Sequence, residues 1–435
     1  MAHSQNPPGT LMTVTAESLV NGERNALGVL RLPRTVLFGP GQRHAVANAV
    51  AGLGRTVLVC TDPRLAASPE LAKMVGEIQS AGVRVQVFGE TEPELPVEGV
   101  VRCVQGLEGL DVDVVIGVGG GSCLDMAKVV ALLLTHGGRP QDYYGESAVP
   151  GPILPVVAVP TTAGTGSEAT PVAVLADPDR EMKVGISSPH LIPHTAVCDP
   201  ELTHSCPPGL TAHSGADAVT HLVESFTAVS RPATAHLAYE RVFIGKSALT
   251  DHIALEGLQL MGRSLLKAYH HPSDADARHD VMLAAFAGGV ALATAGTAAA
   301  HALQYPLGAA THTPHGLGVG TLMPYVMRYN LPARVKEFAQ IARALGVKEH
   351  DRDEASLARA GVEAVDALID GLDLPRTIAE LGLPEDRVQW LAEQGMGATR
   401  LVQNNPQPLD LSAMVAIARA AFTGDRTFPD EPVSS

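Results

Sequence analysis

The sequence predicts an α/β domain built on a parallel sheet, followed by an all-α domain. Three observations lead to this fold class. The chain has 435 residues, which is long for a single domain. Its first half alternates short β-branched runs with helical patterns, and its second half consists of long Ala- and Leu-rich helical stretches. Strands followed by helices indicate two units in series, so we expect domains at 1–205 and 206–435.

Four runs in the first half predict buried strands, and helical patterns lie between them. The strands are expected at 56–60, 83–88, 112–118 and 154–160, and the helices at 71–81, 97–107 and 124–134. Strands separated by helices of this length pair in parallel through right-handed crossovers.

The second half predicts helices throughout. They are expected at 213–228, 247–270, 275–304, 315–329, 333–345, 354–371, 387–395 and 409–422. Residues 281–300 carry no charge, which meets the length rule for a membrane helix. Because this stretch consists largely of Ala, Gly and Thr, we expect a buried core helix and no membrane segment.

Composition excludes several classes of protein. With 46% hydrophobic and 18% charged residues, the chain is not disordered. The formal net charge of −15 argues against nucleic-acid binding, which needs basic side chains. Five cysteines without any C-x-x-C pair favour a reducing compartment. Residues 1–22 show no signal peptide, so we expect the cytoplasm.

A glycine-rich turn connects the third predicted strand to a helix. Gly119, Gly120, Gly121 and Ser122 occupy this turn. Backbone N–H groups there can approach a phosphate at the positive end of the helix. The dinucleotide spacing G-x-G-x-x-G is incomplete, because Ser122 stands at the third glycine position.

Asp62 follows the first predicted strand and is a candidate ligand for an adenosine ribose. Its charge would repel a 2′-phosphate, which favours NAD over NADP. In the alternative interpretation, the glycines form a tight turn and Asp62 caps a helix. A second polar loop, residues 160–168, carries Thr161, Thr162 and Thr165 and is a candidate for the other wall of a nucleotide cleft.

Four side chains in the second half suggest a metal site. Asp217 and His221 are four residues apart on one helix and therefore share a face. His301 and His315 follow on later helices. One carboxylate and three imidazoles suit Fe²⁺ or Zn²⁺. On spacing alone, a surface Asp–His hydrogen bond and a buried core histidine remain open as alternatives.

Together these segments resemble the iron-containing (group III) alcohol dehydrogenases. The matching motifs are FGPG at 38–41, GGGS at 119–122 with Asp125 and Lys128 following, and PTTAGTGSE at 160–168. The match continues with Lys183, GADAVTHLVES at 215–225 and HALQYPLGAATHTPHG at 301–316. The resemblance implies a Rossmann-like NAD-binding domain and a helical domain that holds one divalent metal, the architecture also of dehydroquinate synthase.

The resemblance implies a role for each matching residue. The metal, Fe²⁺ or alternatively Zn²⁺, would be bound by Asp217, His221, His301 and His315. The cofactor residues would be Asp62, Gly119, Gly120, Gly121, Ser122, Asp125, Thr161, Thr162, Thr165 and Lys183, with Lys183 near the nicotinamide. The implied reaction is hydride transfer between an alcohol and NAD(H), or an aldehyde or ketone in reverse.

The chain departs from the family pattern at Tyr305. Many members have a histidine there, which is thought to relay a proton. A phenol, with a reference pKa near 10, is a poorer relay at neutral pH. Either Tyr305 only shapes the pocket, or the proton leaves by another group, for which His312 is a candidate.

Several alternatives remain at this stage. A tyrosine at the position of Tyr305 is also a feature of the hydroxyacid–oxoacid transhydrogenases. The alternative enzyme is therefore an oxo-acid reductase or transhydrogenase of the same superfamily, similar to maleylacetate reductase. A non-catalytic binding protein is the alternative from another class. We expect the substrate pocket near Val172, Phe286 and Tyr305, with segment 230–251 shaping specificity. Members of this family are commonly dimers or larger, so the resemblance implies a homodimer or a larger homo-oligomer.

Overall fold

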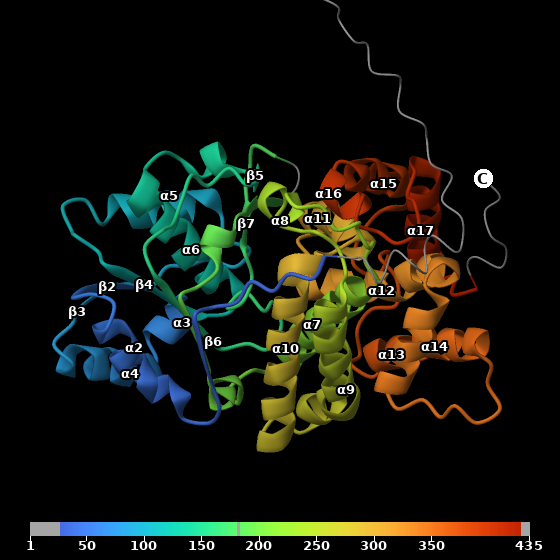
Figure 1. Ribbon diagram of the computed structural model, residues 1–435, viewed down its shortest axis with the longest axis horizontal. Coiled ribbons are helices and arrows are strands. Elements are labelled where there is room, and N and C mark those ends of the chain that lie inside the picture. Colours follow the sequence, from blue (N-terminus) through green and yellow to red (C-terminus); the bar gives the residue numbers. More distant parts are fainter. Residues whose placement is uncertain (1–26, 181–182, 428–435) are drawn as a thin grey trace, which may run out of the picture.

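The computed structural model describes residues 27–180 and 183–427. The interpretation of residues 1–22 therefore lies outside the described residues. Figure 1 shows two halves: an α/β half, coloured blue to green, and a helical half, coloured yellow-green to red. The last strand of the large sheet in chain order ends at Cys198, and the first helix of the helical half begins at Pro208.

The α/β half is built on a six-stranded sheet in the order β1-β9-β6-β4-β2-β3, and every pairing is parallel. The four strands expected from the sequence are confirmed, with small shifts at their ends. Edge strand β1 and its neighbour β9 were not expected. The strands are β1 (Thr35–Phe38), β2 (Thr56–Cys60), β3 (Arg84–Phe88), β4 (Val114–Gly119), β6 (Val156–Pro160) and β9 (Thr195–Cys198).

Helices cover both faces of this sheet. Alternate residues of β2 point to opposite faces: Val57 and Val59 pack in one apolar cluster, while Leu58 and Cys60 pack in another. Such burial on both sides explains the continuous β-branched runs in the sequence. The helices are α2 (Val46–Ala51), α3 (Pro63–Ala66), α4 (Pro69–Ser80), α5 (Val97–Gln105) and α6 (Gly121–His136).

A small second sheet lies beside the first. Strands β7 (Val172–Ala176) and β8 (Lys183–Ser187) form an antiparallel pair, and the short β5 (Gly145–Glu146) adds to β8 in parallel. The sequence analysis placed no strands here. Strand β8 contains Lys183, Gly185 and Ser187, so it lacks the continuous β-branched run that marks β2 and β6.

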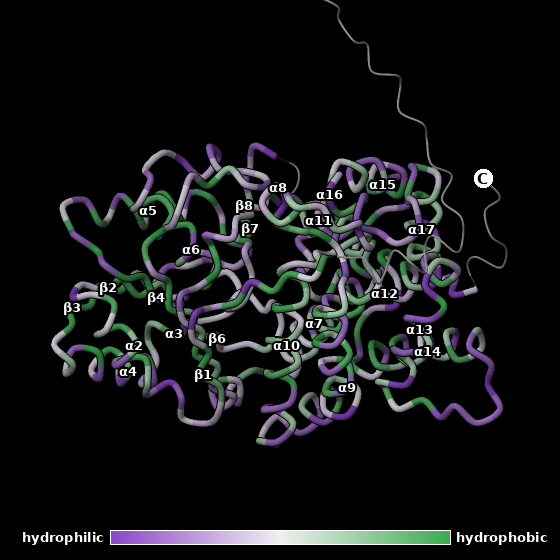
Figure 2. Tube along the Cα trace, viewed as in Figure 1, coloured by the Kyte–Doolittle hydropathy of each residue, from purple (hydrophilic) through white to green (hydrophobic). Residues whose placement is uncertain are grey.

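The helical half buries one large apolar cluster. Figure 2 shows hydrophobic segments along the strands β2 and β4, with hydrophilic segments in outer loops. The eight expected helical stretches all contain helix. The helices are α7 (Pro208–Thr227), α8 (Leu237–Glu240), α9 (Ala248–His270), α10 (Ala275–Ala295), α11 (Ala299–Thr311), α12 (His315–Asn330), α13 (Val335–Ala344), α14 (Glu354–Asp370), α15 (Val388–Met396), α16 (Thr399–Val402) and α17 (Leu411–Thr423).

The single helix expected over 275–304 is wrong. Helix α10 ends at Ala295, and α11 begins at Ala299 after a bend of 104°. Gly296 ends α10 with a φ of 78°, and the Glu224 carboxylate of α7 accepts hydrogen bonds from the N–H groups of Ala298 and Ala300. A carboxylate from a distant helix thus caps the N-terminal end of α11.

The charge-free stretch 281–300 is buried against other parts of the chain, as expected. Among the described residues, no single helix is long and apolar enough to cross a membrane. The bent pair α10 and α11 passes that test by length and composition alone.

Candidate metal centre and nucleotide cleft

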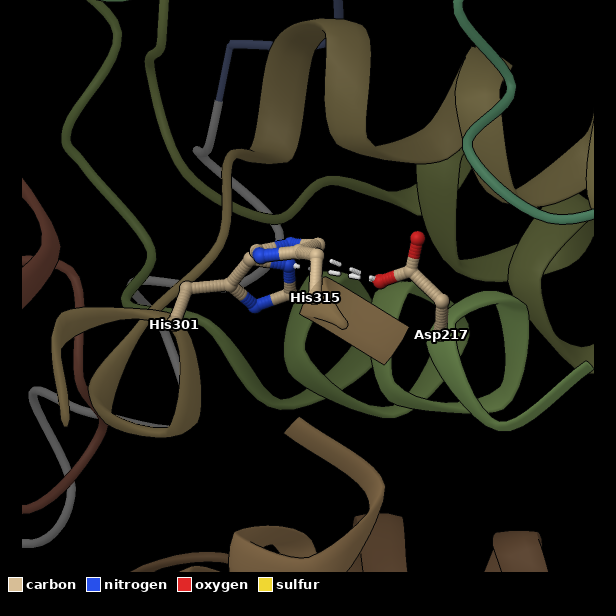
Figure 3. Close-up of side chains that lie close together, drawn as sticks. All are labelled: Asp217, His301 and His315. Atoms are coloured by element: carbon tan, nitrogen blue, oxygen red, sulfur yellow. Dashed lines mark ion pairs between the residues drawn. The ribbon is translucent and has the colours of Figure 1, made fainter. Parts of the chain in front are cut away.

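Three histidine side chains converge on one carboxylate oxygen. The distances from Asp217 Oδ1 to Nε2 of His221, His301 and His315 are 3.4, 3.8 and 3.7 Å. Ligand atoms of Asp217, His301 and His315 all lie within 4.8 Å of one another (Figure 3). His221 is not a member of that tighter group, but its ring stacks on His301 with centroids 4.9 Å apart.

Three helices position these four side chains. Asp217 and His221 lie one turn apart on α7. His301 lies in the first turn of α11, directly after the bend, and His315 is the first residue of α12. The bend that the sequence did not predict therefore turns His301 toward α7.

Glu224 also belongs to this site, although the sequence analysis gave it no role. Its Oε2 lies 2.6 Å from His301 Nδ1, and both residues are buried. A hydrogen bond at Nδ1 fixes the ring and leaves Nε2 facing Asp217. The signal was available, because Glu224 lies seven residues after Asp217 and on the same helix face.

The four residues fit a divalent metal. Within the described part of the chain, Asp217 Oδ1 and His301 Nε2 are buried and have no hydrogen-bond partner, a costly arrangement unless a ligand completes it. Burial lowers the pKa of both His221 and His315, which favours the neutral imidazole that binds a metal. The donors are one oxygen and three nitrogens, which suit iron or zinc.

A cavity of about 200 Å³ connects this centre to the glycine-rich turn. The metal-site residues line it together with Gly121 and Ser122 from the start of α6, and with Thr165 from the second loop. The candidate metal site and the two loops of the α/β half, which are distant in sequence, therefore line the same cavity.

The two loops are neighbours because their strands are neighbours. Strands β4 and β6 pair with Gly119 opposite Pro160, and Thr161 N–H donates to Gly119 O at 2.9 Å. A Cβ on Gly121 would lie 2.6 Å from Thr165 Cγ2, so only glycine allows the loops to approach this closely. Gly120 begins α6 without a side-chain cap, which leaves the helix end available to an anion.

Asp62 lies at the same edge of the sheet, two residues beyond the end of β2. Its Oδ1 accepts a hydrogen bond of 2.9 Å from Leu65 N–H, so Asp62 is the N-cap of α3. The capping role in the alternative interpretation is therefore present. Thr162 lies beside Gly120: a Cβ at Gly120 would be 3.5 Å from Thr162 Oγ1.

Asp125 lines the cavity, but both of its oxygens have protein partners. Oδ1 accepts from Ser167 Oγ at 2.6 Å and Oδ2 accepts from Val174 N–H at 2.9 Å. Buried Lys128 lies 3.8 Å from the same carboxylate. Asp125 thus connects α6 to the second loop and to β7.

Lys183, the first residue of β8, also lines the cavity. It forms an ion pair with Glu94, a lining residue that the sequence analysis did not single out. Burial lowers the pKa of Lys183 to about 8, while the Asp217 carboxylate acts in the opposite direction. A pKa of about 8 is close to neutral pH, so the Lys183 side chain can both hold and release a proton there.

Tyr305 and His312 are placed differently. Tyr305 lines the cavity, with its ring 6.2 Å from that of His315. Burial raises the pKa of Tyr305, which makes proton release harder still. His312 ends α11 in a left-handed conformation, is exposed and is not among the residues that line the cavity.

The expected substrate pocket is partly corrected. Val172 and Tyr305 line the cavity, whereas Phe286 packs against the helical core. Leu292 is the α10 residue that lines it, six positions or about 240° further around the helix. Phe243, from the expected specificity segment 230–251, also lines the cavity, as does Arg400 from α16.

Comparison with known proteins identifies the family. Residues 33–200 match the family model for iron-containing alcohol dehydrogenase, and residues 211–422 match the model for the C-terminal part of the Fe-containing alcohol dehydrogenase family. The chain belongs to the iron-containing alcohol dehydrogenase family. It is an oxidoreductase, and membership of this family implies the use of a metal and of NAD(H).

Individual relatives agree over nearly the whole chain. Long-chain-alcohol dehydrogenase 1 of Geobacillus thermodenitrificans is 34% identical over 390 residues, which cover 89% of this chain and 94% of the relative. The crystal structure of a 1,3-propanediol oxidoreductase superposes with a TM-score of 0.84 at 29% identity, covering 91% of this chain and all of that one. Sulfoacetaldehyde reductase of Bifidobacterium kashiwanohense, solved in complex with NAD⁺, gives a TM-score of 0.76 at 26% identity over 92% of this chain and all of that one.

Proposed function

We propose that the protein is an NAD-dependent alcohol dehydrogenase whose reaction takes place at one divalent metal ion, Fe²⁺ or alternatively Zn²⁺. The observation that carries this proposal is the convergence of three imidazole nitrogens on Asp217 Oδ1, in a cavity that also reaches the start of α6. When bound, the metal supplies Lewis-acid polarisation of the alcohol or carbonyl oxygen, and NAD(H) supplies the hydride acceptor or donor.

The chain's own residues prepare the site. In the proposal, Asp217, His221, His301 and His315 bind the metal, and Glu224 holds the His301 ring in the orientation that exposes Nε2. The buried surroundings exclude water and strengthen the electrostatic contacts.

We assign the dinucleotide to the sheet edge beside the two loops. Gly119, Gly120, Gly121 and Ser122 would accept the pyrophosphate at the uncapped start of α6. Thr161, Thr162 and Thr165 would form the opposite wall, and Asp62 would face the adenosine ribose and reject a 2′-phosphate. Asp125 would support this wall through Ser167 rather than through a direct contact.

We assign the proton to Lys183. Its pKa of about 8 leaves the ammonium protonated at neutral pH, so Nζ can donate to the oxygen of an aldehyde during reduction. Tyr305 would shape the pocket, because its raised pKa opposes proton release. His312 is less suited to this role, because it is exposed and is not among the residues that line the cavity.

The proposal extends to cell compartment and assembly. All five cysteines are buried and unpaired, which is consistent with the cytoplasm. A homodimer or larger homo-oligomer is supported by β1, an edge strand of the sheet that carries the exposed Val36.

A metal-site variant tests the proposal. We expect His301→Ala to lose bound metal, measured by elemental analysis, and turnover, measured by NADH absorbance, while NADH binding persists. His350→Ala is the matched control, because the His350 side chain is 91% exposed. Stoichiometric metal or full turnover in His301→Ala would overturn the assignment. Reconstituting the protein separately with Fe²⁺ and Zn²⁺ would identify the active metal.

A further inference from the structure

Arg400 places a cation without an ion-pair partner in the wall of the active-site cavity. It comes from the short helix α16, and the sequence gave no sign that it would reach the metal centre. Its Nη1 is buried and lacks a hydrogen-bond partner among the described residues. No carboxylate within the described ranges forms an ion pair with it.

The other charged groups in this cavity have partners. Lys183 is paired with Glu94, and Asp125 is bonded to Ser167 and to a backbone N–H group. Asp217 belongs to the metal centre. Arg400 differs from them, because the Glu146 and Glu224 carboxylates attract it electrostatically but neither pairs directly with its guanidinium within the described ranges.

An aromatic ring, rather than a direct ion pair, holds the guanidinium in place. The Arg400 Cζ lies 4.1 Å from the centroid of the Phe243 ring, a cation–π contact. Glu146 attracts Arg400 electrostatically, and its carboxylate also accepts hydrogen bonds from the N–H groups of Val242 and Phe243, which helps to fix the aromatic ring that supports the guanidinium. A guanidinium stays protonated even when burial lowers its pKa.

The location of Arg400 relative to the metal-site residues indicates what kind of group it binds. Tyr305 lies one turn after His301, and electrostatic contact joins Tyr305 to Arg400. Because Arg400, Tyr305 and the metal-site residues line the same cavity, a short molecule can contact both the guanidinium and the metal site.

We propose that Arg400 binds the carboxylate of the substrate, which makes short ω-hydroxy carboxylates, and the matching aldehyde acids in reverse, the preferred substrate class. A planar carboxylate can accept two parallel hydrogen bonds from the guanidinium and removes the cost of a buried, unpaired charge. The hydroxyl end then faces the metal centre, its carbon gives a hydride to NAD⁺, and the hydroxyl proton is released. The carboxylate is unchanged. This inference rests on the function proposed above.

The test compares matched substrates. For the metal-loaded wild type, we expect kcat/KM for ω-hydroxy carboxylates of three to six carbons to exceed that for 1-alkanols of equal length. Arg400→Met should lower the ratio of these two kcat/KM values about 10- to 100-fold, since a hydrogen bond to a charged group is worth that much. Arg400→Lys should restore part of the ratio. Arg419→Met, at an exposed arginine on α17, is the control and should not change it.

A binding measurement provides a readout that does not depend on turnover. We expect pentanoate, but not 1-pentanol, to raise the Tm of the wild-type protein, and this increase to disappear in Arg400→Met. Equal kcat/KM values for acids and alkanols, or an equal loss for both in Arg400→Met, would overturn the inference while leaving metal-dependent alkanol oxidation intact. Absence of NADH formation with every substrate would instead overturn the proposed function, and this inference with it.

Discussion

Glu224 connects the metal centre to the fold. It orients His301 through a 2.6 Å contact and also accepts hydrogen bonds from two N–H groups at the start of α11. We expect Glu224→Gln to weaken metal affinity about 10- to 100-fold, because an amide orients the imidazole poorly and leaves it less basic. Competition with a chelator measures this affinity.

The matched control is Glu385→Gln, at a carboxylate whose side chain is 72% exposed. Wild-type metal affinity in Glu224→Gln would contradict the orienting role. A circular dichroism spectrum separates this role from loss of α11.

Single residues differ in how well the sequence predicted them. Asp217 and His221 lie four positions apart on one helix, so local periodicity brings them together. Glu224 has the same spacing signal, and the sequence analysis overlooked it. Arg400 and Glu94 have no such signal, because they reach the cavity from segments whose positions depend on packing.

At the scale of elements, the loop over 160–168 packs directly on the helical half. Gly166 has a φ of 62°, and a Cβ there would lie 2.4 Å from the Gly289 Cα of α10. Backbone atoms cannot move aside as side chains do. The glycines of this loop therefore serve interdomain packing as well as any contact with the nucleotide.

This contact predicts a large effect of Gly166→Ala. We expect a loss of about 2–5 kcal/mol in the free energy of unfolding, from left-handed strain together with overpacking. Gly346→Ala is the matched control: Gly346 has a φ of 81° but nothing within 4 Å of its Cβ position, so it should lose only about 1–2 kcal/mol. Denaturant unfolding measures both values, and equal losses would show that packing contributes nothing.

Element prediction failed where distant groups decide the backbone. The bend between α10 and α11 depends on Glu224, which lies 72 residues before Gly296, the residue that follows α10, so no local pattern could reveal it. The sequence did not reveal strands β1 and β9, because each has only four residues. They are defined by pairing with each other rather than by length.

At the scale of the whole molecule, the metal should act as a crosslink among α7, α11 and α12, since these helices supply its four proposed ligands. A ligand present at 1,000 times its Kd stabilises the folded state by about 4 kcal/mol. We therefore expect chelation to lower Tm by roughly 5 °C, with recovery when Fe²⁺ or Zn²⁺ is added back.

Thermal unfolding monitored with and without chelator measures this shift. His301→Ala provides the comparison, because its Tm should not respond to metal. An unchanged Tm in the chelated wild type would contradict a structural contribution of the metal.

By itself, the sequence determined the order of the α/β and helical halves, the position of the glycine-rich turn between a strand and a helix, and the four metal-ligand candidates. These follow from short-range periodicity and from the chemistry of individual residue types, which a linear pattern retains. Only the tertiary structure decided that α11 turns away from α10, that Glu224 contacts His301 and that Arg400 lines the same cavity as the metal-site residues. These features depend on contacts between groups far apart in the chain, and such contacts form only when the helices pack.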